Sequence, residues 1–376
     1  MKGVTIFTEM SALAQKHQAI NLSQGFPDFD LNPLLGDYLK EAFENGYNQY
    51  APMPGLPLLR ESIVHRIKKK YKVDLSADEH ITVTPGASYG IYCALASFIQ
   101  KEDEVIILEP AYDSYAPNIE ALGGTVVRVP LDTKNFTIDW QKVQDVITPK
   151  SKAIVINTPH NPTGHVWDSK DYESLKEILK DTDIRIISDE VYDHLTFEGK
   201  SHFSIMQDAE LFARSYVIFS FGKVLQATGW KIGFVSAPKT FTNAFRNTHQ
   251  YIGFSVNSIS QYAIGKFLLD NHKLDELPSI FQAKRDLLLK EFAHLPLQVP
   301  FKSMGSYFQL FSFKGLSDLS DRAYANELTI NAKVASIPLS PFYQEETNTK
   351  MLRFCFAKND ATLKQAADKL SAYFGV

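Results

Sequence analysis

The sequence predicts an α/β protein in which a mostly parallel, seven-stranded sheet lies between helices, with a smaller α/β domain beside it. Seven short apolar runs alternate with segments of helical periodicity, which is typical of a sheet covered on both faces. Polar segments follow three of these runs, at Gly86–Ser88, Asn157–Asn161 and Asp189. Because ligands of such sheets bind beyond the carboxyl ends of the strands, we expect these segments to share one site.

The composition is that of an ordinary globular protein. The 376 residues suffice for one large domain and a smaller one, and 44% are hydrophobic and 22% charged. A net charge of −4 gives no basic patch for nucleic acid, and no run approaches the ~18 uncharged apolar residues of a membrane helix. No signal peptide follows Met1–Thr5, and Cys93 and Cys355 lie in apolar runs, as reduced core cysteines do. We therefore expect a cytoplasmic protein with no metal site, no nucleic-acid partner and no membrane partner.

Before residue 80, helical segments alternate with loops. Phe7–His17 and Leu56–Tyr71 have helical spacing, whereas Ile20–Asp30 and Tyr47–Gly55 are loops rich in glycine and proline.

From residue 80 onwards, predicted strands and helices alternate regularly. The predicted strands are Ile81–Thr84, Glu104–Leu108, Thr125–Val129, Ala153–Ile156, Arg185–Ser188, Tyr216–Phe219 and Ile232–Val235. The predicted helices are one opened by Gly86, then Tyr112–Leu122, Trp140–Ile147, 169–180, Phe241–Tyr251 and Ser258–Leu269.

The C-terminal part reads as a second, smaller α/β layer. A long helix at Ile280–Phe292 leads into it. Its predicted elements are a strand at Tyr307–Phe313, a helix at Ser320–Asn331, strands at Val334–Ile337 and Met351–Phe356, and a helix at Ala361–Tyr373. We predict a large domain over residues 41–279 and a small domain formed by residues 1–40 with 280–376.

One lysine stands between two predicted core strands, in Ser220-Phe221-Gly222-Lys223. A lysine held at a strand end inside a core is costly unless it serves chemistry. A desolvated amine loses its proton readily and can form a Schiff base with a carbonyl compound. The alternative is a solvated loop lysine, which is the commoner situation for this residue type.

Five motifs, taken together, resemble the class I and II aminotransferases of the pyridoxal-phosphate fold type I, over essentially the whole chain. They are Gly86-Ala87-Ser88, Asn157–Gly164, Asp189-Glu190-Val191-Tyr192, Ser220–Lys223 and Arg353 within Leu352–Phe356. The resemblance implies pyridoxal 5'-phosphate as cofactor and a homodimer as the working unit.

The resemblance also implies cofactor-binding roles for individual residues. Lys223 would form the Schiff base (an internal aldimine) and later carry a proton, and Asp189 would face the ring nitrogen. Tyr192 and Asn161 would reach the phenolic oxygen of the ring, and Tyr112 would stack on the ring. The phosphate would be held by Gly86, Ala87, Ser88, Ser220 and Lys231, with Tyr50 from the other subunit. Taken singly, Asp189 could be a turn or cap residue, Asn161 part of an Asn-Pro turn, and Tyr112 a core aromatic.

Arg353 is the candidate for the substrate carboxylate, because a guanidinium binds a planar carboxylate through two parallel hydrogen bonds. A structural ion pair is the alternative. By the resemblance, Gly25, Phe26 and Asn161 would also contact the substrate, and a glycine suits close approach to a ligand.

Several segments are similar to the kynurenine and glutamine aminotransferase branch, and most of all to the bacterial methionine aminotransferases within it. The segments similar to the branch are Leu22–Phe29, Asn48–Gly55, Asn157–Pro162 and Thr228–Lys231. Those similar to the methionine aminotransferases are Thr5–Ala14, Tyr112–Pro117 and His249–Tyr251. Lysine at position 231, where many relatives have arginine, is usual in this branch. Val224 departs from the small hydroxyl residue that often follows the Schiff-base lysine, which puts one hydrogen bond near the phosphate in doubt.

The resemblance implies a ping-pong transfer of the amino group of methionine, and of aromatic amino acids, to a 2-oxo acid. An alternative in the same branch is elimination from cysteine conjugates (a β-lyase reaction) or kynurenine–glutamine transamination. A pyridoxal-phosphate-binding transcription regulator is a third alternative, but only about twenty residues precede the Asn21–Asp30 loop, too few for a DNA-binding domain.

Overall fold

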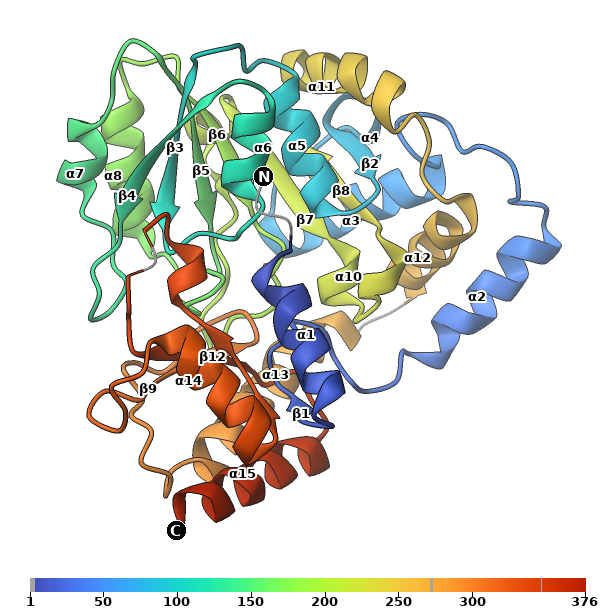
Figure 1. The fold of residues 1–376 in the computed structure, drawn as a ribbon. Helices are drawn as coiled ribbons and strands as arrows, with labels where there is room; N and C mark the ends of the chain where they lie inside the picture. The colour runs from blue at the N-terminus through green and yellow to red at the C-terminus, as the bar shows by residue number, and fades with distance from the viewer. Residues whose placement is uncertain (1–3, 271–272, 346) are drawn as a thin grey trace.

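The computed structural model describes residues 4–270, 273–345 and 347–376, and its centre is a seven-stranded sheet of order β2-β8-β7-β6-β5-β3-β4 (Figure 1). The strands are β2 (Ile81–Thr84), β3 (Glu104–Glu109), β4 (Thr125–Pro130), β5 (Ser151–Asn157), β6 (Arg185–Asp189), β7 (Ser215–Ser220) and β8 (Gly233–Ser236). β8 is antiparallel to both of its neighbours, and every other pair is parallel. The predicted mostly parallel sheet is confirmed.

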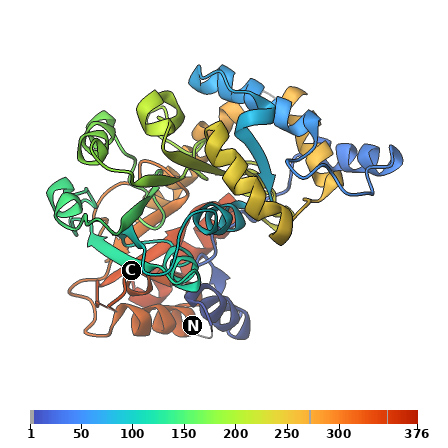
Figure 2. The same cartoon turned by 90° about the horizontal axis from the view of Figure 1, so that it is seen from above.

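The sheet separates two apolar layers, as Figure 2 shows with helices on both sides of it. Along β5, Ala153 and Val155 pack with one layer, while Ile154 and Ile156 pack with the other, because successive strand residues face opposite sides. The first layer is covered by α5 (Ala87–Ala96), α6 (Tyr115–Ala121) and α11 (Lys239–Ile252). The second is covered mainly by α3 (Pro57–Tyr71), α7 (Trp140–Asp145), α8 (Ser169–Leu179), α9 (Ala209–Phe212) and α12 (Ser258–Asp270).

The two ends of the chain pack together below the large sheet (Figure 1). β1 (Ile20–Asn21) pairs in parallel with β10 (Val334–Ala335), and β11 (Ile337–Pro338), β12 (Met351–Cys355) and β9 (Phe308–Ser312) form a three-stranded antiparallel sheet. The helices here are α1 (Ile6–Lys16), α13 (Leu277–Glu291), α14 (Asp321–Glu327) and α15 (Asp360–Phe374). This arrangement supports a small domain built from both chain ends, and its residue boundaries stay a prediction.

Several predicted elements differ from the structure. The helix expected at Ile280–Phe292 begins at Leu277, and the loop expected at Ile20–Asp30 begins with β1. The helix expected from Tyr112 begins at Tyr115, where Pro117 falls in the first turn, the place a helix tolerates proline. The strand expected at Val334–Ile337 is two strands, because residues on either side of Ser336 pair with different sheets. The helix expected at Ser320–Asn331 is α14 followed by the wider turn η4 (Leu328–Ala332).

One long helix was not predicted. α2 (Pro33–Glu44) packs against α12, and Ala42 lies in a buried cluster with Leu56 and Tyr262. Its start is encoded locally, since Asn32 accepts a hydrogen bond from the amide of Leu34 and Pro33 occupies the first helical position. Asn-Pro before an apolar pattern is therefore a signal that sequence reading could have used.

Shorter elements complete the chain. They are α4 (Ala77–His80), α10 (Phe221–Val224), η1 (Ile205–Gln207), η2 (Thr228–Trp230), η3 (Lys273–Glu276) and η5 (Ser340–Phe342). No helix within the three described ranges is both long and apolar enough to cross a bilayer.

A tight backbone contact joins the loop after β5 to the segment before β9. The Gly164 carbonyl accepts hydrogen bonds from the amides of Met304 and Gly305, each at 3.0 Å. Gly164 has φ +77°, and a Cβ placed there would lie 2.0 Å from the Ser303 hydroxyl oxygen. Only glycine fits this approach without displacing the segment.

We predict that Gly164→Ala lowers the midpoint of thermal unfolding more than Gly199→Ala. Both residues have positive φ, but nothing lies within 4 Å of a Cβ at Gly199. Each substitution costs about 1–2 kcal/mol of left-handed strain, and only Gly164→Ala adds a steric cost of about 1–3 kcal/mol. Calorimetry of both variants measures the difference, and equal midpoints would show that Ser303 moves aside freely.

Candidate functional site

The polar strand ends meet at one edge of the large sheet. Asn157 at the end of β5 is in register with Asp189 at the end of β6. On the neighbouring strand β7, Ile218 pairs with Asp189, and Ser220 ends the strand two residues further on. A cavity of about 270 Å³ opens there. It is lined by Phe7, Gln24, Gly25, Ala87, Ser88, Ile91, Tyr112, Asn157, Asn161, Asp189, Val191, Tyr192, Lys223, Phe308 and Arg353.

Lys223 reaches the cavity from α10, the single turn that follows β7. Its Nζ donates to the Gly25 carbonyl at 3.4 Å and lies about 6 Å from the ring centres of Tyr192 and Tyr307. Burial disfavours the charged ammonium and lowers the pKa of Lys223 to about 8, while Asp189 acts in the opposite direction. The amine is thus a usable nucleophile and base near neutral pH.

Asp189 is buried at the end of β6, with its carboxylate in the cavity wall. The Tyr115 hydroxyl donates to Oδ2 at 2.6 Å, and the Val191 amide donates to Oδ1 at 3.3 Å. Burial raises the pKa of Asp189 to about 6, although both of these hydrogen bonds and the charge of Lys223 favour the ionised form. A carboxylate in this position can stabilise a cation placed against it.

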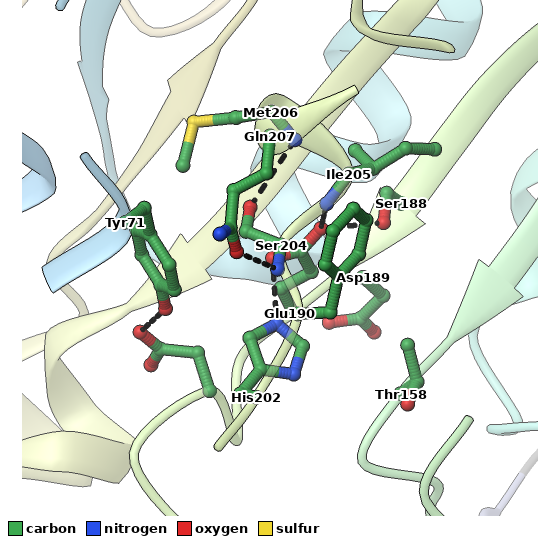
Figure 3. A network of polar contacts seen from close by, with 12 residues as sticks. Tyr71, Thr158, Ser188, Asp189, Glu190, His202, Ser204, Ile205, Met206 and Gln207 are labelled. Carbon is green, nitrogen blue, oxygen red and sulfur yellow. Dashed lines mark hydrogen bonds and ion pairs between the residues drawn. The ribbon is translucent and has the colours of Figure 1, made fainter. Parts of the chain in front are cut away.

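The next residue, Glu190, does not line the cavity and enters a buried network instead (Figure 3). One carboxylate oxygen accepts hydrogen bonds from the Ser188 hydroxyl and the Ile205 amide, each at 3.0 Å, and the other lies 2.8 Å from His202 Nε2. Because Asp189 and Glu190 are consecutive, this network fixes the backbone that carries Asp189.

A chain of hydrogen bonds links the large sheet to the C-terminal sheet. The side-chain nitrogen Nδ2 of Asn157 donates to the main-chain carbonyl of Asp189 at 2.8 Å. The main-chain amide of Asn161 donates to the side-chain oxygen Oδ1 of Asn157, also at 2.8 Å. Arg353 on β12 then donates from Nη1 to Asn161 Oδ1 at 2.7 Å. Since Oδ1 of Asn161 is occupied, its side-chain nitrogen is the group left for a ligand.

Arg353 is 1% exposed and lies among aromatic rings. Its guanidinium carbon is 3.8 Å from the ring centre of Phe308, 5.1 Å from that of Phe7 and 5.3 Å from that of Phe342. Nη2 donates to the Ser23 carbonyl at 3.0 Å, while Nε is buried without a partner in the described structure. Burial lowers the pKa of Arg353 to about 10.

No carboxylate in the described part of the chain forms an ion pair with Arg353. The charge of Asp113 acts on Arg353 without forming an ion pair with it. A buried cation that contacts no counter-ion is costly, so the site prefers an anion. The arginine's fork geometry suits a carboxylate.

The start of α5 forms a second place for an anion. Gly86 precedes the helix and supplies no capping side chain, so the first-turn amides of Ala87 and Ser88, two residues that line the cavity, have no side-chain cap. The Lys231 ammonium lies close by, since a Cβ on Gly86 would be 3.3 Å from its Nζ. Helix end and ammonium together suit a phosphate.

Of the fourteen residues predicted for the site, nine line the cavity. They are Gly25, Ala87, Ser88, Tyr112, Asn161, Asp189, Tyr192, Lys223 and Arg353. Gly86, Ser220 and Lys231 border it without lining it. Phe26 is 44% exposed beneath the Lys358 ammonium, and Tyr50 is 82% exposed against Phe254, outside the cavity of its own chain.

Sequence reading missed several residues that shape the site. Tyr115 and Asn157 contact Asp189, and Phe7 and Phe308 flank Arg353. Asn157 is expected at the site as part of the strand-end segment Asn157–Asn161, but without a role of its own, whereas Tyr115 could have been found from its three-residue spacing after Tyr112. No local signal marks Phe7 or Phe308.

The chain matches known proteins over nearly its full length. The family model "Aminotransferase class I and II" matches residues 17–370. The methionine aminotransferase of Escherichia coli K12 is 41% identical over 98% of this chain and 95% of its own length. The kynurenine–oxoglutarate transaminase of Dictyostelium discoideum is 31% identical over 98% of this chain and 94% of its own.

Solved structures agree with these sequence matches. The Escherichia coli protein YbdL, whose crystal structure and reactivity identify a methionine aminotransferase function, superposes with a TM-score of 0.96 at 40% identity, over 99% of this chain and 98% of that one. The N-succinyldiaminopimelate aminotransferase of Mycobacterium tuberculosis superposes with a TM-score of 0.94 at 33% identity, over 98% and 97%.

We predict that the Lys223 amine titrates near pH 8. Burial makes its folded-state pKa lower than the ordinary ~10.4, so the ammonium loses its proton about two pH units earlier than an exposed lysine. Reductive methylation with ¹³C-formaldehyde keeps the charge of each lysine and gives an NMR signal whose shift follows protonation. Lys223→Arg identifies the signal by its loss, and a midpoint near 10 would contradict the desolvated site.

Proposed function

This chain belongs to the class I and II aminotransferases, and from that premise we propose that it binds pyridoxal 5'-phosphate and transfers the amino group of methionine to a 2-oxo acid. Aromatic amino acids are proposed as further donors. The single observation that carries this proposal is the shared cavity of Lys223, Asp189 and Arg353, in which Arg353 forms no ion pair with a carboxylate of the described residues.

The residues present match the charged parts of this cofactor. Its phosphate suits the start of α5 with Lys231, its ring nitrogen suits Asp189, and its phenolic oxygen suits Tyr192 and Asn161. When bound, pyridoxal 5'-phosphate supplies an aldehyde for amines and a ring that withdraws electrons from the substrate Cα.

Lys223 would act as nucleophile and then as the proton carrier. With a pKa of about 8, about one amine in ten is unprotonated at pH 7, so Nζ can attack a carbonyl carbon. Once free again, Nζ can take the proton from the substrate Cα and deliver it elsewhere on the reacting system. The Gly25 carbonyl, which accepts from Nζ at 3.4 Å, would orient the amine during this step.

The walls beside Arg353 favour uncharged donors. If Arg353 binds the α-carboxylate of the amino donor, the donor's side chain would lie in the cavity that Phe7, Ile91 and Phe308 help to line. An apolar and aromatic wall suits methionine, phenylalanine, tyrosine or kynurenine better than aspartate. The methionine and kynurenine activities of the related proteins are consistent with this preference.

We propose that the working enzyme is a cytoplasmic homodimer. Tyr50, Tyr251 and Ile252 are large side chains that are 82%, 86% and 51% exposed, as expected of residues that a second subunit covers. Tyr50 would then reach the phosphate site of the neighbouring subunit. The two free, buried cysteines suit a reducing compartment.

We predict that Arg353→Ala lowers kcat/KM at least a hundredfold for every amino donor, because two charge-assisted hydrogen bonds to the common α-carboxylate are lost, at about 1.5–3 kcal/mol each. Arg353→Lys retains the charge but not the paired geometry, and should recover part of the loss. The measurement is steady-state transamination with methionine, phenylalanine and a 2-oxo acid. Lys223→Ala, with the fold retained, serves as the inactive reference.

An unchanged kcat/KM in Arg353→Ala would assign that arginine a structural role. Parental activity in Lys223→Ala would overturn the proposal as a whole. Ammonia release without any 2-oxo acid would identify elimination instead of amino transfer.

A further inference from the structure

Tyr115 contacts two residues proposed to meet the cofactor ring, although it does not line the cavity itself. Its hydroxyl donates to Asp189 Oδ2 at 2.6 Å. Its ring packs edge-on against that of Tyr112, with centroids 5.7 Å apart. Tyr115 is the first residue of α6 and is 3% exposed, so its position is fixed by packing against the sheet.

We propose that Tyr115 is a positioning residue, which anchors one oxygen of Asp189 and keeps this carboxylate ionised for the ring nitrogen of the cofactor. The inference rests on the proposed function and adds to it a group that never touches the cofactor. Tyr115 would also support the Tyr112 ring from the side. One residue at the start of α6 would thus position both Asp189 and Tyr112 for the cofactor.

The hydrogen-bond inventory of Asp189 shows why this hydroxyl matters. Within the described residues, the side chain of Asp189 has two hydrogen-bond donors, and the amide of Val191 is the longer at 3.3 Å. Asp189 is 4% exposed, and Tyr115 is 3% exposed and does not line the cavity, so water from the cavity does not readily replace this donor. Removing the Tyr115 hydroxyl therefore leaves a buried carboxylate that takes up a proton more easily.

Other ionisable groups face Asp189 and have to be kept constant in any test. The Lys223 ammonium favours the ionised carboxylate, and the buried Glu190 disfavours it. Tyr112 and Tyr192 interact with Asp189 from the remaining sides. Tyr115→Phe changes none of these groups and keeps the ring that packs on Tyr112.

The test measures binding of pyridoxine 5'-phosphate to the cofactor-free protein by fluorescence, over a pH range that brackets the pKa of Asp189. This probe has an alcohol in place of the aldehyde, so the titration of Lys223 as a nucleophile does not enter. Protonation of Asp189 removes the partner of the ring cation, and binding weakens as the pH falls. In Tyr115→Phe the fall in affinity at low pH (the acid limb) should begin about one pH unit higher. The affinity on that limb should then be roughly tenfold lower than in the parent at the same pH, whereas at neutral pH the loss should be only about twofold.

Tyr216→Phe is the matched control. Tyr216 is fully buried, and its hydroxyl lies 2.9 Å from the Ser97 hydroxyl and also interacts with Arg185, at the opposite end of the sheet from the cavity. Tyr216→Phe removes a buried hydroxyl as Tyr115→Phe does, but it should not change the pH at which the affinity begins to fall.

A double-mutant cycle separates positioning from general destabilisation. In an Asp189→Asn background, Tyr115→Phe should change the affinity less than twofold, because the carboxylate it acts through is gone. A tenfold loss that persists there would assign Tyr115 a purely structural role. Identical acid limbs in the parent and Tyr115→Phe would also refute the inference, whereas a parent that binds neither this probe nor pyridoxal 5'-phosphate would refute the proposed function.

Discussion

The desolvation of charge at one edge of the parallel sheet is the constraint on which this site depends. Asp189 and Arg353 are buried there and Lys223 is half-buried, and the loss of solvent favours the neutral form of each, which shifts its pKa. For Lys223 the shift produces a reactive amine, whereas Asp189 and Arg353 need partners to stay charged. A ligand with a cationic ring, a carbonyl group and a carboxylate supplies those partners, which is why the same three residues point to one chemistry.

Hydrogen bonds connect the buried charges at the edge of the large sheet to the two ends of the chain. Nη1 of Arg353, on β12, is linked through Asn161 and Asn157 to the backbone of Asp189. Nη2 of Arg353 donates to the carbonyl of Ser23. The site therefore exists only when the C-terminal sheet and the N-terminal loop are docked on the large sheet. The Gly164 contact with residues 303–305 holds the same two parts together from another side.

Much of this could be predicted from the sequence, since the apolar runs and the polar residues after them have strong local patterns. Short motifs within or just after apolar runs contain Asp189, Asn161, Lys223 and Arg353. Phe308 has no such local pattern, and Tyr115 has only its spacing from Tyr112. Their importance arises from contacts such as the Tyr115–Asp189 hydrogen bond, which spans 74 positions of chain. The continuous run at Val334–Ile337 gave no sign that its halves join different sheets.

The visible absorption spectrum of the purified protein tests the central claim most directly. We expect a yellow protein that bleaches when L-methionine is added without a 2-oxo acid, and that regains its colour when a 2-oxo acid follows. That cycle requires the bound cofactor, the Lys223 amine and methionine as donor together. A colourless protein that pyridoxal 5'-phosphate cannot turn yellow would contradict the account built on Lys223.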